Sequence, residues 1–312
     1  MKSNPIIVVS GEPKSIFLEV FFKALKLKKY KSPIILICNK KILLNHVKKN
    51  NFKKKINIIK FSELKKNILN NNCINLINIK FTVGKTNQYL NDSFEMAFKL
   101  IKDKFSQKLI NGPINKSTFL KKKHLGITEY ISHKFNIKNT GMLIYGKNLS
   151  VCPLTTHLPL KLVAQNISKK KILQKIKLIR EFYKRFLNFN PKIAILGLNP
   201  HCESILNYNE DLKIIKPIID SQRKKFNLYG PFSADTAFLK NNRKKFDVIL
   251  GMYHDQVLAP IKALFEFEPI NITMGLPFLR ITPDHGPNKK MVGKNKSNPT
   301  SVINALKFLD KI

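Results

Sequence analysis

The chain has 312 residues, of which 43% are hydrophobic. This is enough to bury a core and, at roughly 150 residues each, to form more than one domain. No apolar run reaches the ~18 residues of a membrane-spanning helix, and we expect no membrane segment and no signal peptide. The four cysteines show no CxxC spacing, which predicts reduced thiols in a cytoplasmic protein.

The formal net charge of +38 is extreme. One explanation is binding to nucleic acid, because cationic side chains release counterions from phosphates. However, only five of the 57 basic residues are arginine, the side chain whose planar fork reads phosphates and bases. Lysine is spread along the whole chain, which favours a compositional bias. We therefore expect no nucleic-acid partner, and keep a basic nucleic-acid-binding protein as an alternative.

Short runs rich in isoleucine and valine predict strands, and longer segments with helical spacing of apolar residues predict helices. In chain order we expect strand 6–10, helix 14–28, strands 34–37 and 56–59, helices 92–105 and 169–186, strand 192–196, helix 210–226, strand 248–251 and helix 301–312. Asp92 and Ser301 are the expected N-caps of their helices. The alternation predicts an α/β protein with a mostly parallel sheet.

Three histidines lie in unusual settings. His201 and His254 each follow a predicted strand, where open α/β sheets place their ligands, and His157 lies in a Thr-Thr-His-Leu-Pro segment. Three neutral imidazoles converging on one point would suit a divalent cation such as zinc, although a single histidine is more often a core or surface residue. Asp235 could be an acidic group beside such a cation, or the cap of a helix over 236–242.

Other polar residues suit an anionic ligand. Arg280 lies in an apolar stretch without other charges, and such an arginine usually binds an anion or a carboxylate. Together with Lys262 and Asn271 it would suit a phosphate. The segment 284–299, punctuated by glycine and proline, is either a ligand-binding loop or an ordinary surface loop. Neither GxGxxG nor GxxxxGK[ST] occurs, so the sequence indicates no Rossmann or P-loop nucleotide site.

Taken together, these motifs resemble the 4-hydroxythreonine-4-phosphate dehydrogenase family of pyridoxal phosphate biosynthesis. The resemblance runs in order from Gly11 to about Ser301. The matching segments are Gly112-Pro113-Ile114-Asn115-Lys116, Gly126 with Thr128-Glu129, Thr155 to Leu160, Leu198-Asn199-Pro200-His201, Gly230-Pro231 to Thr236, Met252 to Gln256, and Asn271 to Phe278 with Asp284-His285-Gly286.

The resemblance implies a two-domain α/β/α fold of the isocitrate/isopropylmalate dehydrogenase type, with the active site in the interdomain cleft. The first domain would comprise 1–128 and about 275–312, and the second 129–274 with the histidines and dimer contacts. The implied reaction is the NAD-dependent, metal-assisted oxidation of 4-phosphohydroxy-L-threonine, with decarboxylation to 3-amino-2-oxopropyl phosphate.

The resemblance also implies roles for individual residues. His157, His201 and His254 would bind one divalent ion (zinc, magnesium or cobalt) at a site shared between the subunits of a homodimer, with Asp235 beside it. The substrate, chiefly its phosphate, would be held by Thr128, Lys262, Asn271 and Arg280. The late loop would take NAD, or NADP, through Asp284, His285, Gly286, Gly293, Lys294 and Asn298.

The chain departs from the family pattern at three places, one of which is the late loop, where Asn295 and Pro299 stand in unusual positions. The first loop, 11–19, lacks two glycines and a proline of the family's Gly-Glu-Pro to Gly-Pro-Glu pattern. Ile127 stands where the family has a histidine before the Thr-Glu pair. The departure at Ile127 leaves open a sister dehydrogenase that acts on another phosphorylated hydroxy acid, such as a four-carbon sugar acid phosphate.

Overall fold

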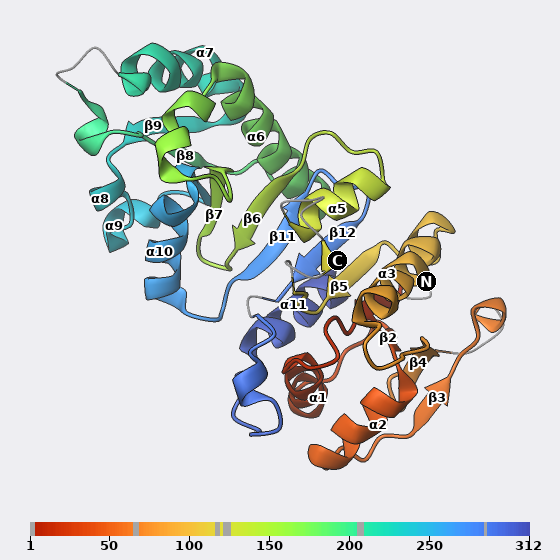
Figure 1. Cartoon of the computed structure of the whole chain (residues 1–312). Coiled ribbons are helices and arrows are strands. Elements are labelled where there is room, and N and C mark those ends of the chain that lie inside the picture. The colour runs from red at the N-terminus through yellow and green to blue at the C-terminus, as the bar shows by residue number, and fades with distance from the viewer. Residues whose placement is uncertain (1–3, 65–68, 116–118, 121–125, 205–208, 284–285) are drawn as a thin grey trace. The chain divides into compact units, whose positions relative to one another are not determined.

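The computed structural model describes residues 4–64, 69–115, 119–120, 126–204, 209–283 and 286–312. Its contacts divide the chain into two units (Figure 1). The first comprises Met1–Phe135 and Leu276–Ile312, and the second Asn136–Gly275. Boundaries predicted from sequence fell after residue 128, which lies within helix α5 (Ile127–Lys134), and near 274. No helix among the described residues is long and apolar enough to cross a bilayer.

Among its described residues, the first unit contains six parallel strands in the order β3-β4-β2-β1-β5-β12. These strands are β1 (Ile6–Val9), β2 (Ile34–Cys38), β3 (Ile56–Ile58), β4 (Ile74–Asn78), β5 (Lys108–Asn111) and β12 (Leu279–Thr282). The central strands β1 and β2 are buried along their whole length, as expected for a parallel sheet covered on both faces.

The α-helices in the described part of this unit are α1 (Phe17–Leu27), α2 (Lys40–Lys49), α3 (Thr86–Lys102), α5 and α11 (Thr300–Lys311). The chain moves across the sheet in one direction through α1 and α2 and returns through α3. Because such crossovers are right-handed, α3 covers the face opposite to α1 and α2, as Figure 1 shows. Helix α11 packs against α1 and β1.

The second unit has the strand order β11-β6-β7-β10-β8-β9, with β7, β10, β8 and β9 parallel and β6 antiparallel to both of its neighbours. These strands are β6 (Gly141–Tyr145), β7 (Ser150–Thr155), β8 (Ile193–Leu196), β9 (Leu228–Phe232), β10 (Val248–Tyr253) and β11 (Ile270–Met274). The carboxyl ends of the four parallel strands therefore share one edge of the sheet.

Five α-helices and two π-helical turns accompany this sheet in the described part of the second unit. Helix α6 (Lys169–Phe182) continues as a π-helical turn to Leu187, and a similar turn at Asp211–Ile215 precedes α7 (Lys216–Phe226). Short helices α8 (Ala234–Ala237) and α9 (Lys240–Arg243) precede α10 (His254–Phe265). A buried cluster of aliphatic and aromatic side chains packs α8 and α10 against β7, β8 and β10.

The two predicted N-caps, Asp92 and Ser301, are wrong, and so is the alternative in which Asp235 caps a helix. Helix α3 begins at Thr86, so Asp92 lies in its interior rather than at its N-cap. Helix α11 begins at Thr300 after Pro299, and Ser301 is buried within its first turn. Asp235 lies inside α8, which follows Ser233. For α3 and α11 the apolar spacing indicated a helix but did not fix its first residue. The expected helix over 236–242 is instead two short helices, α8 and α9.

Candidate functional site

The three histidines and Asp235 lie beyond the carboxyl ends of neighbouring parallel strands in the second unit. His157 comes two residues after β7, and His254 directly after β10 as the first residue of α10. His201 lies in the turn after β8, and Asp235 in the helix after β9. Parallel strands thus bring to one sheet edge four residues that are far apart in sequence.

His157 and His254 face one another. Their ring centroids are 6.2 Å apart, with the ring planes inclined by 34°. Two imidazoles bound to one zinc ion at about 2.0–2.1 Å have ring centres roughly 5–6 Å apart. Within the described part of the chain, no group of three or more His, Cys, Asp or Glu side chains lies close enough to hold a metal ion. The three-histidine site therefore stays a prediction.

A carboxylate fixes the ring of His254. Its Nδ1 lies 2.6 Å from Oδ1 of Asp255, which leaves Nε2 as the nitrogen directed away from this contact. Metal-binding histidines commonly have this arrangement, with a carboxylate orienting the ring and raising its basicity. His157 and His201 also adopt positive φ, at 53° and 56°. Non-glycine residues rarely adopt this conformation outside turns and ligand-binding segments.

The turn that carries His201 is held by Asp211, a residue that the sequence did not single out. Asp211 is fully buried, and its carboxylate accepts hydrogen bonds from the backbone of Leu198 (2.7 Å) and Asn199 (3.1 Å) and from Nδ2 of Asn199 (2.8 Å). A side chain at Gly197 would bring its Cβ within 2.6 Å of Asp211 Oδ1, so only glycine fits there.

Gln256 ties the His254 segment to the same turn. Its Oε1 accepts a hydrogen bond from the backbone of Met252 (2.7 Å), and its Nε2 donates to the Gly197 carbonyl (2.7 Å). The hydrogen bonds of Gln256 thus connect the ends of β8 and β10 beyond the last paired residues of these two strands. Sequence periodicity could not reveal this because both Asp211 and Gln256 occupy positions that look like the polar face of a helix.

Asp211→Ala is expected to lower the free energy of unfolding by about 3 kcal/mol, because it leaves buried N–H groups without an acceptor. Urea denaturation measures the loss. Asp220→Ala is the control, since Asp220 is an exposed residue in the next helix and forms only a surface ion pair with Arg223. Equal stability of the two variants would show that Asp211 does not hold the turn.

The first unit places Arg280 and Thr128 together. Arg280 is 1% exposed, and its Nε donates to Asn111 Oδ1 (2.7 Å) and its Nη1 to Thr128 Oγ1 (3.1 Å). Burial lowers the pKa of Arg280 to about 9, while the negative charge of Glu129 raises it. The guanidinium stays charged at neutral pH, and a buried cation of this kind favours an anionic ligand. Ile127, at the start of α5, is partly exposed.

The remaining predicted residues are placed as follows. Lys262 lies in α10 and Asn271 in β11, both in the second unit and both partly exposed. Burial lowers the pKa of Lys262. In the late loop, Gly286, Gly293, Lys294 and Asn298 are exposed. Asp284 and His285 lie outside the described residues.

The chain is similar to several known proteins. The family model of the pyridoxal phosphate biosynthetic protein PdxA matches residues 29–309. A 4-hydroxythreonine-4-phosphate dehydrogenase of Sulfurihydrogenibium sp. is 36% identical over 97% of this chain and 96% of its own length. A D-threonate 4-phosphate dehydrogenase of Pectobacterium atrosepticum is 32% identical over 62% and 61% of the two chains.

The fold has the same relatives. A crystal structure of 4-hydroxythreonine-4-phosphate dehydrogenase from Klebsiella pneumoniae superposes with a TM-score of 0.84, covering 98% of this chain and 97% of its own at 24% identity. The class is therefore an α/β protein built on a large, mainly parallel sheet. The chain belongs to the PdxA family of pyridoxal phosphate biosynthetic proteins.

Proposed function

We propose that this protein oxidises 4-phosphohydroxy-L-threonine with NAD and a divalent cation and decarboxylates it to 3-amino-2-oxopropyl phosphate, a step of pyridoxal 5'-phosphate biosynthesis. The observation that carries the proposal is the edge of the second unit's sheet. There, His157 and His254 lie 6.2 Å apart at their ring centroids, and His201 follows the neighbouring strand, in a chain similar over nearly its full length to a dehydrogenase of that name.

The donor set fits a divalent cation. Neutral imidazoles suit zinc or cobalt, and the acidic side chain of Asp235 beyond β9 could support magnesium or lie beside the site. His157, His201 and His254 would hold the ion, with Asp255 keeping Nε2 of His254 in the binding orientation. A bound cation would supply Lewis acidity toward the substrate's hydroxyl oxygen, and NAD or NADP would supply the hydride acceptor.

The chain's own residues would bind and orient the substrate. Arg280 and Lys262 would contact the phosphate. Both cations are buried or partly buried, and a bound anion would compensate for their loss of hydration. Thr128 already lies at hydrogen-bond distance from Arg280 and would share the phosphate with it. Asn271 would donate a further hydrogen bond. Fixing the phosphate in this way orients the reacting carbon relative to the histidines.

The proposal includes a homodimer. The family resemblance implies that a ligand from the partner subunit would bind the cation together with His157, His201 and His254. Light scattering at the protein concentrations used for assay should give about twice the 36.0 kDa chain mass. A monomer that retains full activity would contradict a shared site.

The second candidate substrate is D-threonate 4-phosphate or a similar acid. Ile127 favours it, because isoleucine cannot donate the hydrogen bond that the family histidine could give next to Thr128 and Arg280. The similarity to a protein named as a D-threonate 4-phosphate dehydrogenase adds to this candidate.

Ile127→His separates the two substrates. If 4-phosphohydroxy-L-threonine is the substrate, the new hydrogen bond should lower its KM by about 2- to 12-fold, the value of a neutral hydrogen bond of about 0.5–1.5 kcal/mol. Steady-state kinetics with both compounds measure this, and Ile127→Leu is the control for packing. The substrate assignment is wrong if the variant leaves 4-phosphohydroxy-L-threonine unused and abolishes turnover of the other acid.

A further inference from the structure

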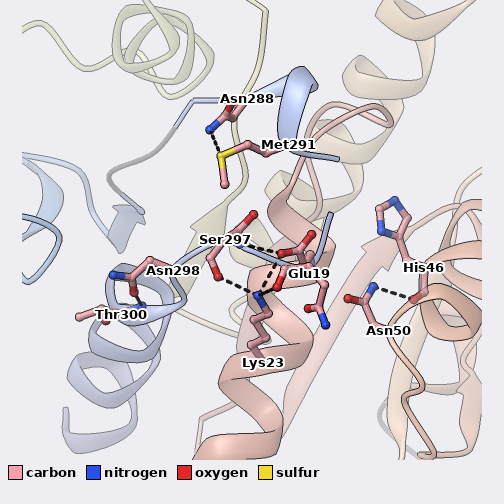
Figure 2. A network of polar contacts seen from close by, with 10 residues as sticks. Glu19, Lys23, His46, Asn50, Asn288, Met291, Ser297, Asn298 and Thr300 are labelled. Carbon is pink, nitrogen blue, oxygen red and sulfur yellow. Dashed lines mark hydrogen bonds and ion pairs between the residues drawn. The ribbon is translucent and has the colours of Figure 1, made fainter. Parts of the chain in front are cut away.

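The loop between β12 and α11 is fastened to helix α1, within the first unit. At the start of the loop, the backbone N–H of Ile16 donates to the Pro287 carbonyl (3.1 Å). Near its end, the Nζ of Lys23 donates to the carbonyl oxygens of Asn295 and Ser297, both at 2.9 Å. Figure 2 shows Lys23 and Glu19 pointing from α1 to the loop segment at Ser297.

Glu19 also holds the loop, and we call Glu19 and Lys23 together the clamp. It is 2% exposed, and its Oε1 accepts hydrogen bonds from the Ser297 backbone N–H (2.9 Å) and from Lys23 Nζ (3.0 Å), one helical turn away (Figure 2). Burial acts to raise the pKa of Glu19, but the Ser297 N–H and Lys23 outweigh it, and the pKa is lowered. Glu19 is therefore an ionised, buried carboxylate whose partners are the loop and the lysine.

The loop needs such support because its own backbone is irregular. Gly293 has φ of +83° and Asn295 has φ of +52°. A non-glycine residue at positive φ persists only where its surroundings impose it. Lys294 and Asn298, both exposed, flank in sequence the residues 295–297 that α1 holds. Oδ1 of Asn298 also accepts a hydrogen bond from the backbone N–H of Thr300 at the start of α11 (2.9 Å).

We propose that Glu19 and Lys23 are positioning residues for the dinucleotide cofactor. They hold the main chain between Lys294 and Asn298 in the conformation that binds the adenosine portion of NAD. The inference rests on the proposed function, in which NAD is the hydride acceptor, and on the family resemblance, which implies that this loop binds NAD. A loop that is ordered before binding loses less conformational entropy when the ligand arrives, so the clamp raises cofactor affinity without touching the reacting atoms.

Glu19→Gln and Lys23→Met are the variants that test the clamp. Each should raise the KM for NAD by about 10-fold while kcat and the KM for the phosphorylated substrate change by less than about 2-fold. Lys23→Arg, which keeps the charge and the donors, should restore most of the affinity. The Lys23 side chain is 23% exposed, so its replacement tests the clamp even if Glu19→Gln unfolds the protein.

Lys26→Met is the matched control. Lys26 lies one turn further along α1 and also donates to two backbone carbonyls, those of Asn50 (2.8 Å) and Asn51 (3.2 Å), outside the late loop. It should leave the KM for NAD unchanged. A lower melting temperature for Glu19→Gln and Lys23→Met without any selective change in the KM for NAD would overturn the inference, because it would mean that the clamp only stabilises the fold.

Hydrogen exchange separates this inference from the function on which it rests. In the parent protein, NAD should protect amides in 286–299, and amides 294–298 should exchange faster in the free Glu19→Gln and Lys23→Met variants. If NAD leaves the loop of the parent unprotected, the cofactor assignment is wrong and the inference falls with it. If NAD protects the loop equally well in the parent and both variants, at equal affinity, only the clamp is refuted.

Discussion

Replacing His254 with alanine is expected to remove the bound divalent cation and to lower kcat/KM by more than about 100-fold. The residues that merely orient metal ligands already account for about 10- to 100-fold in affinity or activity, and loss of a ligand should cost at least as much. His254 begins α10, faces His157 and is held by Asp255, so a change to alanine removes one donor without removing a core contact.

Metal content by mass spectrometry and NADH production measure the two effects together. His157→Ala and His201→Ala should behave like His254→Ala, whereas His133→Ala, an exposed histidine of α5 in the other unit, should keep both metal and activity. Asp255→Asn should have metal content and activity between those of His254→Ala and His133→Ala. A His254→Ala protein that remains fully active in metal-stripped buffer would end the metal hypothesis.

Arg280→Ala should lower kcat/KM by about 30- to 150-fold, the equivalent of about 2–3 kcal/mol for one buried, charge-assisted contact to the substrate phosphate. Arg280→Lys should also reduce activity, because a point charge does not replace a planar fork that donates from several nitrogens. Asn111 and Thr128 accept hydrogen bonds from two different nitrogens of the Arg280 guanidinium, and an ammonium group could not keep both contacts in the same geometry.

Arg280 is buried, so its replacement also tests stability. Melting curves in the presence of saturating substrate separate a folding defect from a binding defect, and Arg223→Ala is the control because Arg223 forms only an exposed ion pair. The binding role predicts that inorganic phosphate stabilises the parent more than the Arg280→Lys protein. Parent-like kinetics for Arg280→Ala would refute the phosphate assignment.

The sequence predicted the α/β class because long apolar periodicities survive in a fold whose parallel strands are buried. The strand at 6–10 and the helix at 301–312 lie within a residue of β1 and α11. Seven described strands were missed. Polar residues, glycine or proline interrupt their apolar runs, and only pairing with neighbours shows that these segments are extended. They are β4, β5, β6, β7, β9, β11 and β12.

For the candidate site, too, the sequence could reveal some residues and not others. His201 and His254 could be found because each follows an apolar strand, a signal that lies within a few residues of sequence. Asp211, Gln256 and the Glu19–Lys23 clamp could not, because each acts through backbone groups of a segment that is remote in sequence. Apolar periodicity carries no information about which polar side chain is buried and which carbonyl or N–H it meets.

NADH production from 4-phosphohydroxy-L-threonine, assayed with and without a chelator, tests the central claim most directly. The proposed function predicts NADH formation with release of carbon dioxide, loss of both with the chelator, and recovery on addition of zinc, cobalt or magnesium ions. The contrary result is no NADH under any metal condition together with tight binding to arbitrary DNA that weakens steeply with salt, which would mean that the high positive charge serves nucleic acid.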